Sequence, residues 1–230
     1  MNNKYPLTRL EESIGYHFKD EKLLKSAVSH SSYINELMIN KYPDYQRLEF
    51  LGDAVLELTV SDFLYKNRPD MQEGEMTQLR AALVCEPTLA FCAQELSLSD
   101  YILLGKGEDA QGSRYHDSIV SDIFEAIIGA IYLDAGDEGF ACAAAFINRF
   151  VITDMEKKRL FHDSKSCLQN RVQKEGGVLE YRLIAETGPE HMRKFTVAAV
   201  IDGKDISEGT GSSKKTAEQR AAYEALVKLS

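Results

Sequence analysis

The chain has 230 residues, of which 44% are hydrophobic and 27% are charged, as is usual for a globular protein with one full core and a smaller second domain. No apolar run approaches the ~18 residues of a transmembrane helix, and the opening MNNKYPLTRLEES lacks the apolar core of a secretory signal, so we expect no membrane partner. The formal net charge of −9 argues, at first, against a nucleic-acid partner.

Residues 1–158 show the pattern of consecutive amphipathic helices, with few strand signals. The expected helices are Leu7–Ile14, Glu21–Ser29, Arg47–Lys66, Gly74–Ala82, Pro87–Leu96, Ser118–Asp134 and Gly139–Thr153. The charged stretch EKKRLFHDSK then interrupts the pattern. We therefore predict an all-α domain over residues 1–158 and a linker over residues 159–162.

An acidic stripe crosses the apolar stretch QRLEFLGDAVLEL, residues 46–58. On a helix, Glu49, Asp53 and Glu57 fall within an arc of about 80°. The arc is either the solvated edge of a core helix or a carboxylate cluster that faces a cleft. One helix alone does not distinguish these two interpretations.

A second apolar helix, within SDIFEAIIGAIYLD, carries Asp122 and Glu125 at positions i and i+3, on a face shared with Ala126 and Gly129. If the two acidic faces pack together, four carboxylates converge, which is unfavourable unless cations neutralise them. Hard oxygen ligands at this density suit Mg²⁺ or Mn²⁺. The alternative is that the two arcs face water separately.

The pattern changes over residues 163–230, where we predict a small α+β domain of order α-β-β-β-α. SKSCLQNRVQKEGG is expected to form a helix, YRLIAET a strand, and KFTVAAVIDGKDISEG two strands joined by the turn signal Asp202-Gly203. The final helix is TAEQRAAYEALVKL. This order gives a three-stranded antiparallel sheet with both helices on one face.

The negative charge belongs to the helical part of the chain. Residues 1–162 hold 16 Lys and Arg against 26 Asp and Glu, whereas residues 163–230 hold 11 against 10. The small domain can therefore still concentrate positive charge locally. The four cysteines show no CxxC spacing and favour reduced thiols, hence a cytoplasmic protein.

Several motifs now point to a family. RLEFLGDAVL resembles the signature of the ribonuclease III family, and SDIFEAIIGAIYLD resembles its second acidic motif. VSHSSY, GEMTQLRAALV and ILLGKGE are further matching pieces, while KSCLQNRVQ, TGPEHMRKFTV and EGTGSSKKTAEQRAA resemble a double-stranded-RNA-binding domain. The resemblance covers essentially the whole chain, in the domain order of the bacterial enzymes.

The resemblance implies that the metal-binding carboxylates are Glu49, Asp53, Asp122 and Glu125, with Asp53 and Glu125 closest to catalysis. It implies a homodimer with two Mg²⁺ ions (or Mn²⁺) per active site, which hydrolyses double-stranded RNA to leave 5′-phosphate and 3′-hydroxyl ends. The expected substrates are precursor rRNA, structured mRNA and tRNA precursors.

The sequence departs from the family pattern just before the signature, where the family usually has Asn-Glu and this chain has Tyr45-Gln46. Because that Glu is linked to cleavage-site interactions, Gln46 leaves substrate positioning in question. Glu73, expected in the loop before the helix at Gly74, resembles a further secondary acidic position. Phe50 and Leu51 are candidates for the dimer contact, with packing in the core as the alternative.

The start of the last helix, GTGSSKKT, is not a P-loop, because Ser213 stands where the motif needs glycine. Its amides, with Lys214 and Lys215, are instead expected to meet phosphates of an A-form duplex. By resemblance, Ser166, Gln169 and His191 match residues that contact the minor groove. The full set of candidate RNA-binding residues is Ser166, Gln169, His191, Ser213, Lys214 and Lys215.

Three functions are compatible with these observations. The first is a metal-dependent endoribonuclease for double-stranded RNA, for which all four carboxylates are present. The second is a non-cleaving regulator that binds double-stranded RNA, and it would be favoured by a missing carboxylate. The third is a metal-dependent phosphohydrolase of small molecules, against which the C-terminal module argues.

Overall fold

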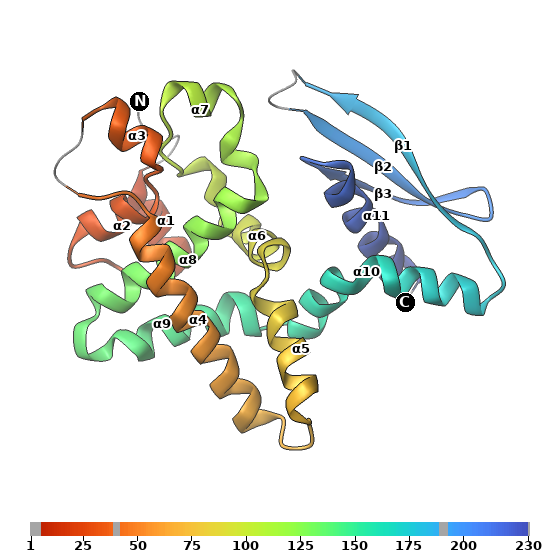
Figure 1. Ribbon diagram of the computed structural model, residues 1–230, viewed down its shortest axis with the longest axis horizontal. Helices are drawn as coiled ribbons and strands as arrows, with labels where there is room; N and C mark the ends of the chain where they lie inside the picture. The colour runs from red at the N-terminus through yellow and green to blue at the C-terminus, as the bar shows by residue number, and fades with distance from the viewer. Residues whose placement is uncertain (1–5, 39–41, 189–192, 230) are drawn as a thin grey trace. The chain divides into compact units, whose positions relative to one another are not determined.

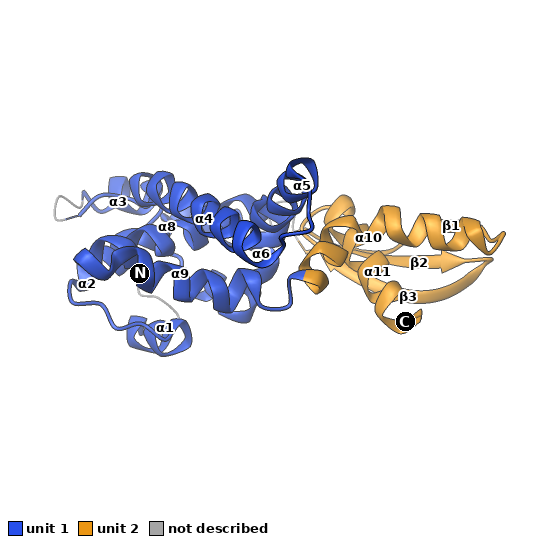
Figure 2. Ribbon diagram, turned by 90° about the horizontal axis from the view of Figure 1, so that it is seen from below, with its two compact units in different colours: residues 1–155 blue, residues 156–230 orange. Residues whose placement is uncertain are grey.

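The computed structural model describes residues 6–38, 42–188 and 193–229. The chain divides into two compact units, residues 1–155 and residues 156–230, which Figure 2 shows in different colours. Among the described residues, no helix combines the length and the apolar character that crossing a membrane requires.

The first unit is all-helical, as the sequence predicts (Figure 1). Its α-helices are α1 Leu7–Ile14, α2 Glu21–Ala27, α3 Ser31–Glu36, α4 Gln46–Asn67, α5 Glu73–Val84, α6 Glu86–Glu95, α7 Lys106–Ala110, α8 Asp117–Asp134 and α9 Gly139–Ile147. Shorter turns are the 3-10 helices η1 Leu98–Asp100, η2 Ser113–Tyr115 and η3 Gly136–Glu138 and the π-helix η4 Asn148–Ile152. The short helices α3 and α7 were not expected from the sequence, because each is too short to show an apolar period.

Helix α8 is the centre of this unit and packs against α2, α4, α6 and α9 (Figure 1). It is apolar nearly all round, which is the pattern of a helix surrounded by other helices. Its buried residues are Val120, Ser121, Ile123, Phe124, Ala126, Ile127, Ile128, Gly129, Ala130 and Ile131. Between residues 120 and 131, only Asp122 and Glu125 remain partly exposed, and they mark the narrow strip of α8 that its neighbours leave uncovered.

The last residue of α8, Asp134, ties the N-terminal segment to the central helix. Its carboxylate accepts hydrogen bonds from the Tyr16 hydroxyl at 2.8 Å, the Lys19 amide at 2.9 Å and the Asp20 amide at 2.8 Å. Burial alone would raise the pKa of Asp134, but these donors hold it below its ordinary value. The carboxylate thus stays charged and serves the fold through three hydrogen bonds.

The second unit has the predicted α-β-β-β-α order. It consists of α10 Met155–Lys174 (whose first residue belongs to the first unit), β1 Leu179–Thr187, β2 Lys194–Ile201, β3 Lys204–Gly211 and α11 Lys214–Leu229. The strands form an antiparallel sheet in the order β1-β2-β3, with α10 and α11 on one face (Figure 1). The core between helices and sheet contains Leu168, Val172, Ala199, Ala221, Ala222, Ala225 and Leu226.

The turn between β2 and β3 confirms the Asp202-Gly203 signal. Both residues have positive φ, 50° and 76°, as the two-residue hairpin turn requires. Asp202 also accepts a hydrogen bond from the Val178 amide at 2.8 Å, which fixes the segment before β1. The turn chemistry thus sets the register of the two strands.

The stretch expected as a linker, residues 159–162, lies inside the continuous helix α10. Its charges interrupt the apolar pattern but not the helix, because Phe161, Ser164, Leu168 and Val172 are buried at helical spacing. The buried stripe of the second unit therefore begins earlier than the charge pattern indicates. The first compact unit ends at residue 155 and the second begins at residue 156, whereas the sequence predicts that the first domain ends at residue 158 and the second begins at residue 163.

Candidate functional site

Helices α4 and α8 touch backbone to backbone where Gly52 crosses Gly129. A Cβ atom at Gly52 would lie 1.8 Å from the carbonyl oxygen of Glu125, and one at Gly129 would lie 2.2 Å from the carbonyl oxygen of Leu48. Only glycine permits so close an approach. The signal for Gly52 in the sequence is a glycine inside an apolar helix, a pattern that often has a packing reason.

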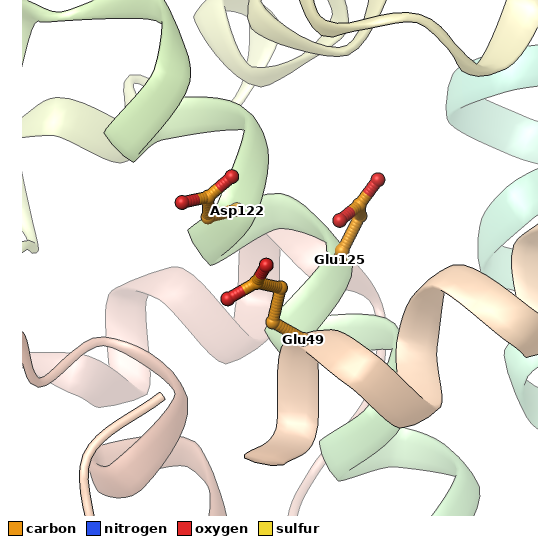
Figure 3. A group of neighbouring side chains, drawn as sticks. All are labelled: Glu49, Asp122 and Glu125. Atoms are coloured by element: carbon orange, nitrogen blue, oxygen red, sulfur yellow. The ribbon is translucent and has the colours of Figure 1, made fainter. Parts of the chain in front are cut away.

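This crossing brings the acidic faces of the two helices together, as one of the two sequence interpretations requires. One oxygen from each of Glu49, Asp122 and Glu125 lies within 4.8 Å of the other two, and all three residues are partly buried. Figure 3 shows Glu49 on α4 and the other two side chains on α8, around a common space. We call these three residues the carboxylate cluster.

The electrostatics of the carboxylate cluster are those of like charges held together away from water. Burial, followed by repulsion from Asp53, Asp122 and Glu49, raises the pKa of Glu125 from 4.5 to about 8. Burial and the neighbouring carboxylates Asp122, Asp53 and Asp44 also raise the pKa of Glu49. A divalent cation would relieve this repulsion, and the all-oxygen donor set is the one that Mg²⁺ and Mn²⁺ prefer.

Two other acidic residues of α4 lie outside the carboxylate cluster. Asp53, one turn after Glu49, is exposed, although its charge raises the pKa values of Glu49 and Glu125. Glu57, a further turn along, faces Arg80 of α5 at 3.6 Å. The acidic arc predicted from the sequence thus reaches the cluster only at its first member, Glu49, and Asp53 borders it.

Tyr45, just before α4, contacts the cluster and is backed by His30, just before α3; in the sequence, Tyr45 stands out only as a departure from the family pattern. The Tyr45 hydroxyl donates to Oδ2 of Asp122 at 3.2 Å, and the His30 ring stacks on the Tyr45 ring with centroids 5.8 Å apart. Burial raises the pKa of Asp122 above its ordinary value, and the bond from Tyr45 and the nearby His30 offset only part of this rise. The contact joins residues 77 positions apart, so a pattern along the chain carries no signal of it.

The remaining candidates near the start of α4 lie on an exposed surface. Gln46 and Phe50 line an open cavity of about 790 Å³ together with Leu51. Phe50 is 81% exposed, whereas Leu51 packs partly against the core.

Glu73 is exposed and begins α5 instead of preceding it, because Gln72 and Glu75 form a capping box there.

The predicted RNA-binding residues fall on two helices of the second unit. On α10, Ser166 is exposed and Gln169 partly so, away from the buried Leu168 and Val172. At the start of α11, Lys214 and Lys215 are exposed, and the Ser213 hydroxyl accepts from the Thr216 amide at 3.1 Å as an N-cap. His191 lies outside the described residues.

Comparison with known proteins places both units in families. Residues 20–155 match the family model "Ribonuclease-III-like" and residues 164–229 match "Double-stranded RNA binding motif". The chain is 48% identical to Ribonuclease 3 of Bacillus licheniformis over 96% of this chain and 89% of that protein. It belongs to the ribonuclease III family. Ribonuclease 3 of Anoxybacillus flavithermus is 47% identical over 96% of this chain and 93% of that protein.

Solved structures agree with this assignment to the ribonuclease III family. The nuclease domain of ribonuclease III from Campylobacter jejuni has a TM-score of 0.57 and 41% identity, over 64% of this chain and 95% of that chain. A second structure of that domain shows structural flexibility in a region involved in dimer formation. It has a TM-score of 0.56 and 41% identity, over 63% of this chain and 98% of that chain. The chain is therefore a ribonuclease III family endoribonuclease for double-stranded RNA, which confirms the predicted enzyme class.

Proposed function

We propose that the carboxylate cluster is the site of phosphodiester hydrolysis and that Asp53 completes it, with two Mg²⁺ or Mn²⁺ ions per active site. The single observation that supports this site is the approach of three carboxylate oxygens within 4.8 Å of one another. Bound cations would neutralise this charge, lower the pKa of water and stabilise the negative charge of the transition state. The products would carry 5′-phosphate and 3′-hydroxyl ends.

The roles of the four carboxylates follow from their environments. Glu125 and Asp122, held by the buried helix α8, would be the fixed ligands, and Glu49 would complete the set from α4. Asp53 is exposed, so its side chain is free to turn toward a cation when one is bound. A raised pKa means that Glu125 gives up a proton when a cation binds, so binding is expected to strengthen as pH rises.

We infer that the second unit supplies affinity for the duplex. The start of α11 would present its positive dipole end and the ammonium groups of Lys214 and Lys215 to phosphates, and Ser166 and Gln169 would offer neutral contacts to the minor groove. These contacts read the shape of the duplex, so little sequence specificity is expected from them. The substrates would be structured RNAs, such as precursor rRNA, mRNA and tRNA precursors.

We further propose that the chain acts as a homodimer through the surface around Phe50. An aromatic side chain that is 81% exposed beside an open apolar cavity is typical of an association surface. A dimer would also place two carboxylate clusters in one particle, one for each strand of the duplex. The Campylobacter jejuni nuclease domain has a region involved in dimer formation.

The proposal is tested with a long RNA duplex and Mg²⁺, with and without EDTA. Glu125→Gln should abolish cleavage and retain duplex binding in a gel-shift assay, because it changes the cluster and leaves the second unit intact. Glu57→Gln is the matched control: it removes a carboxylate from the same acidic arc but outside the cluster. Parental cleavage by Glu125→Gln, or cleavage in EDTA, would show that the cluster is not the site.

A further inference from the structure

Tyr45 is fixed at both ends immediately before α4. Its side chain is only 5% exposed, and its amide donates to the carbonyl of Ser29 at 3.0 Å. At the other end, its hydroxyl donates to Oδ2 of Asp122 at 3.2 Å. A side chain that is buried and anchored through its backbone has little freedom to release that bond.

The face of the Tyr45 ring is supported by His30, which is itself held in place. The two rings stack at an interplanar angle of 28°. The His30 amide donates to the carbonyl of Leu103 at 2.9 Å, and His30 Nδ1 accepts from the Ser32 amide at 3.2 Å. The Ser32 hydroxyl in turn accepts from the Gly105 amide at 3.0 Å. This chain of contacts holds the tyrosine against α8.

We propose that Tyr45 is a positioning residue that orients the carboxylate of Asp122 for cation binding, an inference that rests on the proposed function of the cluster. With Oδ2 engaged by the hydroxyl, the carboxylate cannot rotate freely, and its remaining lone pairs stay available to a cation. Groups that hydrogen-bond a ligating carboxylate fix its orientation, and their loss typically weakens metal affinity by about 10- to 100-fold.

The alternative is that the bond only stabilises the fold, and α8 contains the control that separates the two. Asp134 on the same helix accepts a hydrogen bond from the Tyr16 hydroxyl at 2.8 Å. Asp134 lies 12 residues after Asp122, about 18 Å along the helix. Tyr16→Phe therefore removes the same kind of bond from the same helix without touching the carboxylate cluster.

The test measures Mn²⁺ binding to the full chain without RNA, from the electron paramagnetic resonance signal of free Mn²⁺. Tyr45→Phe should raise the dissociation constant about tenfold, whereas Tyr16→Phe should leave it unchanged even if both lower the melting temperature. Cleavage by Tyr45→Phe should require more Mg²⁺ and recover at saturating Mg²⁺. If Tyr45→Phe does not fold, Tyr45→Met also removes the hydroxyl and fills the site with a flexible apolar chain.

Three results are distinguishable. Unchanged Mn²⁺ affinity in a folded Tyr45 variant overturns the positioning role and leaves the cation site standing. An equal loss of affinity in Tyr45→Phe and Tyr16→Phe shows a general effect of stability and also overturns the role. If Glu125→Gln does not weaken Mn²⁺ binding, the cation site itself is wrong, and the inference fails with it.

Discussion

Replacing Gly52 with alanine tests whether the helix crossing creates the active site. The added methyl group would lie 1.8 Å from the carbonyl oxygen of Glu125, and ordinary contact begins at 3.4 Å. The two helices must therefore separate by about 1.6 Å, because the obstacle is backbone and no side chain can move aside. The carboxylate of Glu49 would move away from those of Asp122 and Glu125 by a similar distance.

The expected effects are large in both stability and catalysis. Overpacking of a tight core costs typically 1–3 kcal/mol, so the melting temperature of the first unit should fall by roughly 2–12 °C. Displacement of catalytic groups by about 1 Å costs roughly 100-fold in rate. Cleavage of a long duplex should therefore drop by about two orders of magnitude even at temperatures where the protein is folded.

The assay combines thermal unfolding of the full chain with cleavage rates at a temperature below both transitions. Gly74→Ala on α5 is the control, because a Cβ atom there would meet nothing within 4 Å, and it should be neutral or stabilising by up to ~1 kcal/mol. If Gly52→Ala behaves like Gly74→Ala in both measurements, the crossing does not position the carboxylates as described.

Three further measurements address the charges and surfaces of the site. In EDTA, the free energy of unfolding should fall as pH rises from about 4.5 to about 8, because the folded state holds the proton of Glu125 to a higher pH than the unfolded state does. Thermal melts should show a smaller fall in the Glu125→Gln variant, and also in the parent protein when Mg²⁺ replaces EDTA. A stability of the parent that does not change with pH in EDTA would contradict this. Replacing Lys214 and Lys215 with Ala should flatten the slope of log RNA affinity against log salt concentration by at most ~1.8, and by the same amount for duplexes of unrelated sequence. Unchanged affinity would show that the start of α11 does not contact the RNA. Phe50→Ala should shift sedimentation toward the monomer with little change in melting temperature. The control is Phe140→Ala, at a residue of α9 that is 40% exposed, and it should leave sedimentation unchanged. If Phe50→Ala also leaves sedimentation unchanged, the association surface lies elsewhere.

Local patterns in the sequence predicted most of the fold. The helix Leu7–Ile14 ends where Gly15 takes a positive φ, and the Asp202-Gly203 turn forms as its chemistry requires. The hypothesis that the two acidic helices face each other, one of two alternatives that the sequence leaves open, combined two local periodicities with the small residues of α8. These features are encoded within a few residues of where they appear, so a single sequence shows them.

The parts that were not predicted depend on contacts between distant segments. The bond between Tyr45 and Asp122 spans 77 residues, and the backbone contact of Gly52 depends on the other helix. Asp53 shares an arc with Glu49 in the helical projection, yet the closest oxygens come from Glu49 and α8. The continuity of α10 depends on its buried stripe, which the charges of residues 156–165 obscure.

The continuity of α10 affects how proteases reach the boundary between the two units. A protease needs an extended segment of chain, which exposed loops provide and a hydrogen-bonded helix does not. Lys157 and Arg159 are exposed, so trypsin can approach them, but they lie within the helix. Cleavage there requires α10 to open locally, and its rate at low protease concentration reports the free energy of that opening.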